Sequence, residues 1–382
     1  NWPMLLWPLV GIILTSMFMR RILRRNIAHG VSLLQHQLTQ RRYKISGRIT
    51  WAPIIASGIT LGFGGSAGAE GPIAYSGAAV GSTIGRLCGL SPRMLMILVG
   101  CGAGAGIAGI FKAPIGGALF TLECLGLQLP AVAVVALLAS TITSAMVVYV
   151  CMGWTLDLTY FPTETFHVQW LPYIIILGLF CGIYSIYYSH ICSVMKRWFA
   201  RISNHWLRNI SGGAILAVSL FMFPSLYGEG YGTMGHIING QWSVIADGSV
   251  LHSLLHGTTG IIIISASIIM LKCFASTATN SSGGVAGDFA PTLFAGCIAG
   301  LFFATMLNSV MGLDLPVAMF AYLAMAGVMS GAIGAPLMSI FITVEMTGTY
   351  SLFLPVVIVA ILSFAITYMA RHKTINHRQI PQ

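Results

Sequence analysis

The sequence has very few charged residues. Only 7% of its 382 residues are Asp, Glu, Lys or Arg, and nine of these are acidic. A soluble domain usually carries about 25% charged residues. Together with 56% hydrophobic residues and a mean hydropathy of +0.85, this shortage excludes an ordinary soluble domain. It predicts a multi-pass protein of a cell membrane, with the lipid bilayer as its solvent.

The alternating polar pattern of a transmembrane β-barrel is also missing, so we expect an all-α polytopic membrane protein. Apolar runs approach the length of about 20 residues that a spanning helix needs. The clearest are 3–19, 130–152, 170–189, 258–274, 315–329 with an extension to 346, and 352–370. Many runs are interrupted by the 44 Gly or 15 Pro residues. This pattern predicts broken and re-entrant helices, which persist where protein or a cavity covers their free backbone ends.

Motifs for metal binding and catalysis are lacking too. The eight Cys residues include no CxxC pair, and the ten His residues have no HExxH-type spacing, so we predict no metal site. No Ser/Lys or paired-Asp arrangement indicates an intramembrane enzyme. We therefore expect no cofactor and no enzymatic activity.

The scarce charge is mostly positive, with a net charge of +10. Basic clusters border apolar segments at 20–25, 40–44, 196–201 and 371–373, which is typical of positive-inside topology. No basic, aromatic-rich soluble domain is present, so nucleic acid is not an expected partner. Because the chain begins with Asn1 inside an apolar run, we expect its first helices to be missing; no signal peptide is visible.

The chain contains an internal repeat. GIFKAPIGGALFTLECLG (109–126) lines up without gaps with GAIGAPLMSIFITVEMTG (331–348), and upstream of these GAEGP (68–72) corresponds to GDFAP (287–291). Two motifs recurring in the same order predict two related halves of one integral membrane domain. We place these halves at 1–160 and 161–382, with no soluble domain.

GAEGP and GDFAP share the form Gly-x-x-x-Pro, which predicts a helix start. Pro suits the first turn of a helix, and Gly leaves the backbone amides uncovered. A helix N-terminus carries about half a positive charge and attracts anions. Internal repeats are typical of transporters whose substrate sites lie between the halves. Two facing helix starts would make an anion site without any Lys or Arg.

These motifs resemble those of the CLC family of chloride channels and chloride/proton exchangers, in its prokaryotic form. GAEGP looks like the family's G-[KR]-E-G-P motif and GDFAP like its G-x-F-x-P motif, while AHGVS (28–32) occupies the place of G-S-G-I-P. The resemblance extends from about residue 15 to the end of the chain. It implies a fold of two inverted-topology repeats, and a homodimer with one pore in each subunit.

The resemblance also implies roles for individual residues. Glu70 takes the place of the family's external gate, a carboxylate that competes with anions, swings out when protonated and carries protons in exchangers. A purely structural helix cap is the alternative for this residue. The expected anion-binding residues are Gly68, Ala69, Glu70, Gly71, His29, Gly30, Val31, Gly287, Asp288, Phe289, Ala290 and Asn376.

Several of these positions depart from the family pattern. His29 stands where the family has a Ser that donates to the anion; it either provides a pH-sensitive contact or turns aside. Asn376 stands near the place of a donor Tyr. The family's pair of glutamates is Glu123–Cys124 here, which favours weak or absent proton coupling. A possible proton route would run through Glu70, Glu123 and Cys124.

Three acidic positions call for a structural interpretation. Glu123 and Glu345 are equivalent in the repeat, and we favour a structural role for both as hydrogen-bonded glutamates at helix ends. Asp288 stands where the family generally has an apolar residue. Its carboxylate would repel an anion, so we expect it to face away from the pore or to cap a helix.

The sequence therefore predicts transport of chloride or a similar small inorganic anion, gated by a glutamate, with proton coupling weak or absent. A 2 anion/1 proton exchanger is the main alternative. A fluoride exporter is disfavoured because that subgroup usually has Met where this chain has His29. An organic-anion transporter of another inverted-repeat fold is disfavoured because we expect no buried basic residue.

Overall fold

The computed structural model describes residues 6–22, 30–156, 158–160, 162, 166–249 and 257–378, with side chains up to His372. Throughout this part of the chain the regular elements are helices, and one isolated bridge joins Gly68 to Gly287. The predicted all-α architecture is therefore confirmed.

Fifteen α-helices follow one another along these residues. The first seven are α1 (Trp7–Ile22), α2 (Gly30–Thr39), α3 (Ala52–Gly62), α4 (Glu70–Leu87), α5 (Pro92–Phe111), α6 (Pro114–Leu119) and α7 (Ala131–Met152). The next four are α8 (Leu171–Arg201), α9 (His205–Met222), α10 (Tyr231–Ile238) and α11 (Gly257–Ser282). The last four are α12 (Phe289–Met311), α13 (Val317–Ile333), α14 (Pro336–Thr347) and α15 (Phe353–Arg378).

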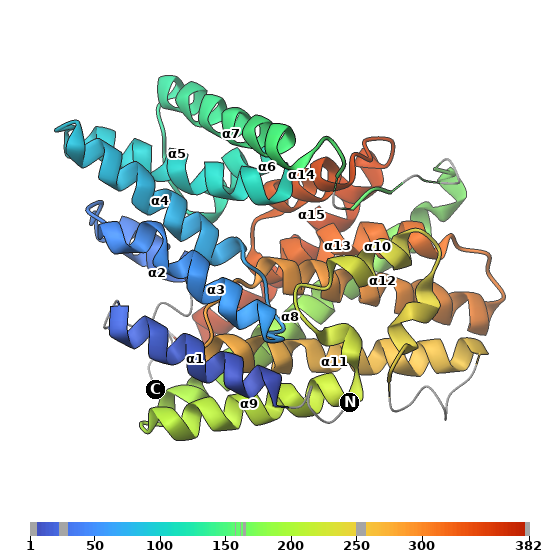
Figure 1. Cartoon of the computed structure of the whole chain (residues 1–382). Coiled ribbons are helices and arrows are strands. Elements are labelled where there is room, and N and C mark those ends of the chain that lie inside the picture. Colours follow the sequence, from blue (N-terminus) through green and yellow to red (C-terminus); the bar gives the residue numbers. More distant parts are fainter. Residues whose placement is uncertain are drawn as a thin grey trace.

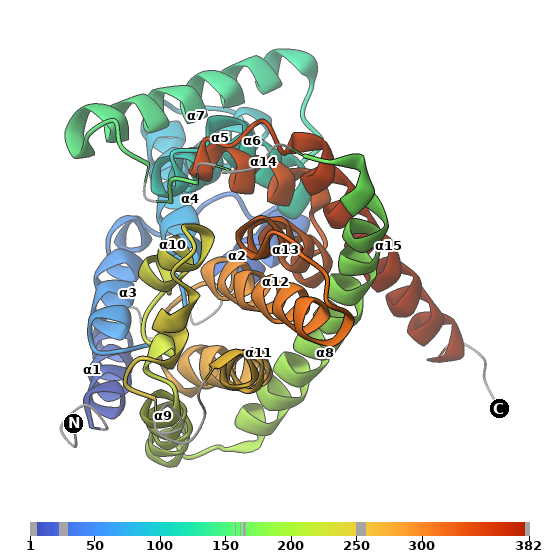
Figure 2. The same ribbon diagram turned by 90° about the vertical axis from the view of Figure 1, so that its right-hand side faces the viewer.

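The most deeply buried helices are α12 and α13. They pack against each other and are flanked by α8, α11 and α15 (Figure 2). The helices of the first half, α1 to α6, gather on one side of this pair (Figure 1). The core thus consists of helices that are apolar on all faces, as expected for helices enclosed by other helices.

Six helical segments are long and apolar enough to cross a membrane. They are Pro92–Phe111, Ala131–Met152, Val168–Arg201, Gly257–Ser282, Phe289–Met311 and Phe353–His372. Four largely coincide with predicted spans, whereas the helices at 92–111 and 289–311, which are rich in Gly and Ala, were not predicted. The predicted run 315–346 is divided in two at Gly334, where φ is 84°, so neither of its helices has the usual spanning length.

The repeat is visible as matching pairs of helices. A long helix, α5 or α13, ends at a left-handed residue, Lys112 (φ 52°) or Gly334 (φ 84°). An Ala-Pro step then starts the short helix α6 or α14, with Pro114 or Pro336 as its first residue. Since α6 and α14 pack together, the two halves meet at equivalent elements, as the fold of two repeats requires.

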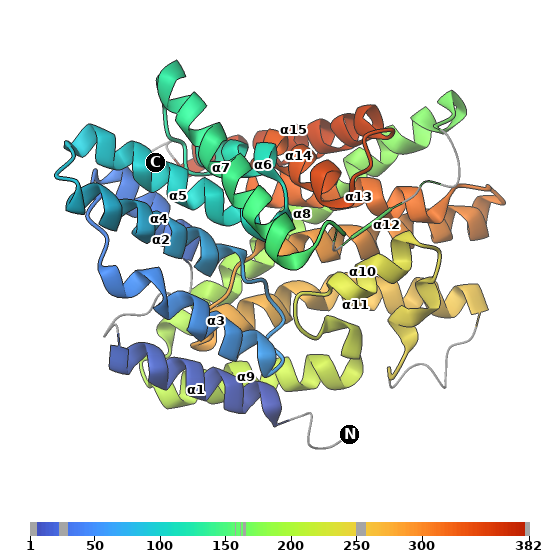
Figure 3. The same ribbon diagram turned by 45° about the horizontal axis from the view of Figure 1, so that its top comes forward.

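Glycines bring α4 and α5 unusually close together, and the two helices lie side by side (Figures 1 and 3). A Cβ atom on Gly77 would collide with the carbonyl oxygen of Gly102, and one on Gly102 would collide with that of Gly77. Small residues allow such close backbone approach in membrane proteins. The position of α4, which begins at Glu70, depends on this contact.

We predict that Gly77→Val lowers the stability of the protein by about 1–3 kcal/mol, because the added atoms overpack the α4–α5 contact. The measurement is the melting temperature in detergent. Gly58→Val is the matched control, since Gly58 lies in helix α3 with open space where a Cβ would stand. Equal melting temperatures for the two variants would show that the close approach is not required.

Candidate anion site between two helix starts

The two repeat motifs meet directly. The Gly68 N–H donates to the Gly287 carbonyl at 3.1 Å, and the Gly287 N–H donates to the Gly68 carbonyl at 2.5 Å. Helix α4 begins two residues after Gly68, at Glu70, and α12 begins two residues after Gly287, at Phe289. The predicted convergence of the two helix starts is confirmed. Their N-terminal partial charges add at one place, which favours negative charge there.

Glu70 places its carboxylate at this junction. The side chain is fully buried. Its Oε1 accepts hydrogen bonds from the Ala290 N–H and from the Tyr231 hydroxyl, each at 3.1 Å, while Oε2 has no hydrogen-bond partner among the described atoms. A carboxylate at the start of α4 therefore binds an amide in the first turn of α12.

The glycines of both motifs make room for this carboxylate. A Cβ on Gly68 would collide with the carboxylate of Glu70. A Cβ on Gly287 would stand 2.9 Å from Glu70 Oε2 and 2.7 Å from the Gly71 nitrogen. The space between the helix starts thus accommodates an anionic group only because neither glycine has a side chain.

A buried lysine lies close to the junction. Lys272, on α11, is fully buried, and its Nζ donates to Ser66 Oγ at 2.9 Å and lies 4.6 Å from the centre of the Phe294 ring. The expectation of no buried basic residue is therefore wrong. The Ser66 hydroxyl and the Phe294 ring contact its amino group, and the carboxylates of Glu70 and Glu229 favour its charged form.

Two residues near Glu70 were not identified from the sequence. Glu229 accepts a hydrogen bond from the Ala69 N–H at 2.7 Å, and Tyr231, at the start of α10, donates to Glu70. Both belong to the irregular stretch GEGYG. The Ala69 amide, which we expected to face an anion, is engaged by Glu229 in this structure.

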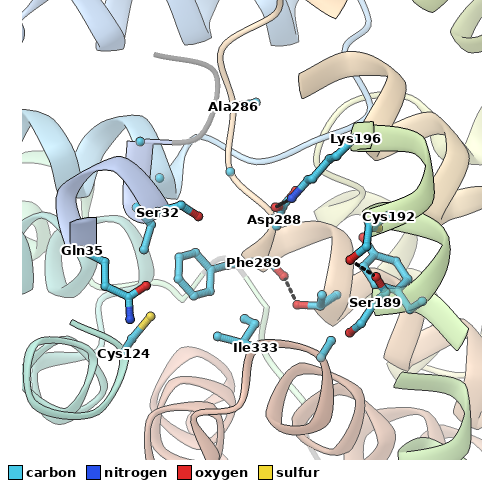
Figure 4. Close-up of a pocket in the computed structure, with 18 of the residues that line it drawn as sticks. Ser32, Gln35, Cys124, Ser189, Cys192, Lys196, Ala286, Asp288, Phe289 and Ile333 are labelled. Carbon is cyan, nitrogen blue, oxygen red and sulfur yellow. Dashed lines mark hydrogen bonds and ion pairs between the residues drawn. The ribbon is translucent and has the colours of Figure 1, made fainter. Parts of the chain in front are cut away.

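A cavity of about 400 Å³ opens beside the junction (Figure 4). Its walls include residues from the three predicted motifs, namely Gly30, Val31, Gly71, Gly287, Asp288 and Phe289, together with Cys124, Lys196 and Arg371. A Cβ on Gly30 would lie 2.9 Å from the Gly71 carbonyl oxygen. The start of α2 therefore lies directly against the start of α4, and the motifs share one cavity.

Asp288 was predicted to face away from the pore or to cap a helix, and the second alternative is wrong. Asp288 lines the cavity and makes no side-chain cap. Its Oδ2 lies 3.5 Å from Lys196 Nζ, and its Oδ1 accepts a hydrogen bond from Asn280 at 2.8 Å. A cation from α8 and an amide from α11 thus satisfy the carboxylate inside the cavity, which removes the need to turn it away.

Glu123 and Glu345 each cap the start of a helix in the other half of the repeat. The carboxylate of Glu123 accepts from the N–H groups of Leu337 and Met338, at 3.2 and 2.8 Å, in the first turn of α14. The carboxylate of Glu345 accepts from those of Ile115 and Gly116, at 3.1 and 2.8 Å, in the first turn of α6. These bonds agree with the structural interpretation of both residues.

Some predicted residues lie outside the described part of the chain. His29 is among them, and so is the side chain of Asn376, whose backbone continues helix α15. Their anion-binding roles remain predictions. Cys124 lines the cavity, whereas the neighbouring Glu123 binds α14, so the proton route also remains a prediction.

Comparison with known proteins agrees with this geometry. The family model described as "Voltage gated chloride channel" matches residues 11–368. The chain therefore belongs to the voltage-gated chloride channel family, the CLC family that its motifs resemble. Its predicted place as a multi-pass protein of the cell membrane follows from this membership and from its apolar helices.

Individual relatives differ in their described activities. A putative chloride channel protein ClcB-like from Ralstonia nicotianae is 27% identical over 98% of this chain and 83% of its own length. An H(+)/Cl(-) exchange transporter ClcA from Vibrio campbellii is 26% identical over 79% of this chain and 62% of its own length. The crystal structure of a slow cyanobacterial Cl-/H+ antiporter superposes with a TM-score of 0.80 at 20% identity, covering 99% of this chain and 88% of that one. The fold is therefore the CLC fold of two inverted repeats.

We predict that Glu345→Ala and Glu123→Ala each lower the stability of the protein by about 1–2 kcal/mol, the usual cost of a lost helix cap. Melting temperatures in detergent measure the effect. Asp314→Ala, which removes an exposed carboxylate, is the control and should be neutral. If Glu123→Ala instead keeps its melting temperature but alters proton movement, Glu123 belongs to a proton route and not to the scaffold.

Proposed function

We propose that the protein carries chloride or a similar small inorganic anion across the cell membrane, through a pore in each subunit of a homodimer. The observation that carries this proposal is the hydrogen bond from the Ala290 N–H to Glu70. The carboxyl group of Glu70 lies between two helix starts, where their partial charges favour an anion. A chloride ion could satisfy the same amide.

Glu70 is the gate in this proposal. A carboxylate at mid-membrane depth costs at least about 2.5–3.5 kcal/mol, so it stays ionised there only if its surroundings compensate it. The Ala290 amide and the Tyr231 hydroxyl favour the ionised form by donating to Oε1, whereas the nearby Glu229 carboxylate opposes it. Protonation removes the charge that holds the carboxylate between the helix starts, and the side chain then gives up its place to an anion.

Proton coupling is weak or absent in this proposal, because Cys124 stands where exchangers of the family usually have their second glutamate. The Glu123 carboxylate is hydrogen-bonded to the start of α14. The Glu123–Cys124 pair therefore offers no carboxylate that is free to carry protons. A 2 anion/1 proton exchanger is the alternative. It is favoured by the relative described as an H(+)/Cl(-) exchange transporter.

We predict that Glu70→Gln removes the pH dependence of anion transport. In the wild type, chloride efflux from liposomes should rise as pH falls, because protonated Glu70 no longer competes with the anion. Glu70→Gln should transport at the acidic rate at every pH, about tenfold faster at neutral pH, equivalent to roughly 1.4 kcal/mol. Asp314→Asn is the control for loss of a carboxylate. An unchanged pH profile in Glu70→Gln would exclude Glu70 as the gate.

We predict that a chloride gradient drives little or no proton movement against a proton gradient in the same liposomes, with a potassium ionophore setting the voltage. Proton movement is followed with an external pH electrode. Proton pumping that is driven by chloride and abolished by Glu70→Gln would contradict weak coupling and establish the exchanger.

A further inference from the structure

An ion pair lies in the wall of the cavity, at the start of α12. Lys196 reaches from α8 toward Asp288, the residue just before α12, and their Nζ and Oδ2 atoms are 3.5 Å apart (Figure 4). Both side chains line the cavity. Their side chains are 37% and 44% exposed, so an ion in the cavity has access to both.

The two charges act in opposite directions on an anion. The first turn of α12 attracts negative charge, and the carboxylate of Asp288 stands at this very place. Without compensation it would repel an anion approaching the Phe289 and Ala290 amides. Lys196 supplies the compensation, and it would itself attract the anion if Asp288 were removed.

The other cation in the cavity wall, Arg371, is hydrogen-bonded to the backbone. Arg371 Nη2 donates to the carbonyl oxygens of Gly331 and Ala332, at 3.2 and 2.9 Å, in the last turn of α13. The Lys196–Asp288 pair, at 3.5 Å, is longer than the roughly 2.7–2.9 Å of a tight charge-assisted hydrogen bond. Lys196 is therefore the cation that can change its partner at least cost.

We propose that Lys196 and Asp288 form an exchangeable ion pair that controls how an anion enters the site from this cavity. The entering anion replaces the Asp288 carboxylate on Lys196, and Asp288 returns to Lys196 when the anion moves on to the helix starts. Asn280, which donates to Asp288 Oδ1 at 2.8 Å, holds the carboxylate while the lysine is away. This inference rests on the proposed function, because it requires a small inorganic anion as the substrate.

A double-mutant cycle tests the exchange, with chloride affinity measured by isothermal titration calorimetry on the purified protein. Lys196→Met leaves Asp288 uncompensated and should weaken chloride binding on the order of tenfold. Asp288→Asn frees Lys196 and should strengthen it. The double variant should return to within about threefold of the wild type, because both charges are gone.

Arg197→Met is the matched control, because Arg197 is the exposed neighbour of Lys196 on α8. It removes the same charge without touching the cavity and should leave chloride affinity unchanged. Asp288→Asn keeps the shape of the side chain, so it also serves if Lys196→Met does not fold. If the ion pair is merely structural, Asp288→Asn lowers the melting temperature of the protein without raising its affinity for chloride. That result would overturn the inference.

Two further results would overturn it. One is a double variant that binds chloride as weakly as Lys196→Met, and the other is single variants that behave like Arg197→Met. In each case wild-type protein still binds and transports chloride, so the proposed function survives. Wild-type protein that neither binds nor transports chloride would instead contradict the proposed function itself.

Discussion

The hydrogen bond between the Glu70 carboxylate and the Ala290 amide depends on most of the fold. It joins the start of α4 to the start of α12, which come from different halves of the chain. The bridge between Gly68 and Gly287 holds the two starts together, and the absence of side chains at these glycines leaves the room that the carboxylate occupies. The close α4–α5 contact and the reciprocal caps on α6 and α14 keep the surrounding helices in place. A negative group between two positive helix ends is thus the interaction around which the scaffold is built.

Several charges inside the described part of the protein are compensated locally. Backbone amides receive the carboxylates of Glu70, Glu123 and Glu345, Lys272 donates to a hydroxyl, and Lys196 faces Asp288. Burying a charge is costly unless it is paired and hydrogen-bonded. Glu123 and Glu345 each accept two amide hydrogen bonds of 2.8–3.2 Å, whereas the Lys196–Asp288 pair is longer, at 3.5 Å.

The sequence predicted the elements that recur within it. The repeat, the two helix starts and their convergence were all predictable, because Gly-x-x-x-Pro has a local physical meaning and occurs twice. The helix at 289–311 was missed although its mean hydropathy of 1.8 exceeds the 1.7 of the helical segment Val168–Arg201, which contains a predicted span. Its Gly and Ala residues suit a helix packed on every side.

The partners of the site were less predictable. Tyr231 and Glu229 approach Glu70 and Ala69 from about 160 residues away along the chain, and no local pattern reveals such a contact. Asp288 turns into the cavity because Lys196 receives it there, which its own neighbours in sequence do not indicate. Lys272 could have been noticed, since an ionisable residue in a membrane span indicates a functional position.

In the proposed function, Glu70 occupies the place of the transported anion. The most direct measurement is anomalous X-ray scattering from crystals of the wild type and of Glu70→Gln, both grown in bromide. We expect a bromide ion beside the Ala290 amide in Glu70→Gln, where Glu70 Oε1 lies in the wild type, and none there in the wild type at neutral pH. Crystals of Glu70→Gln without bromide beside this amide would contradict it.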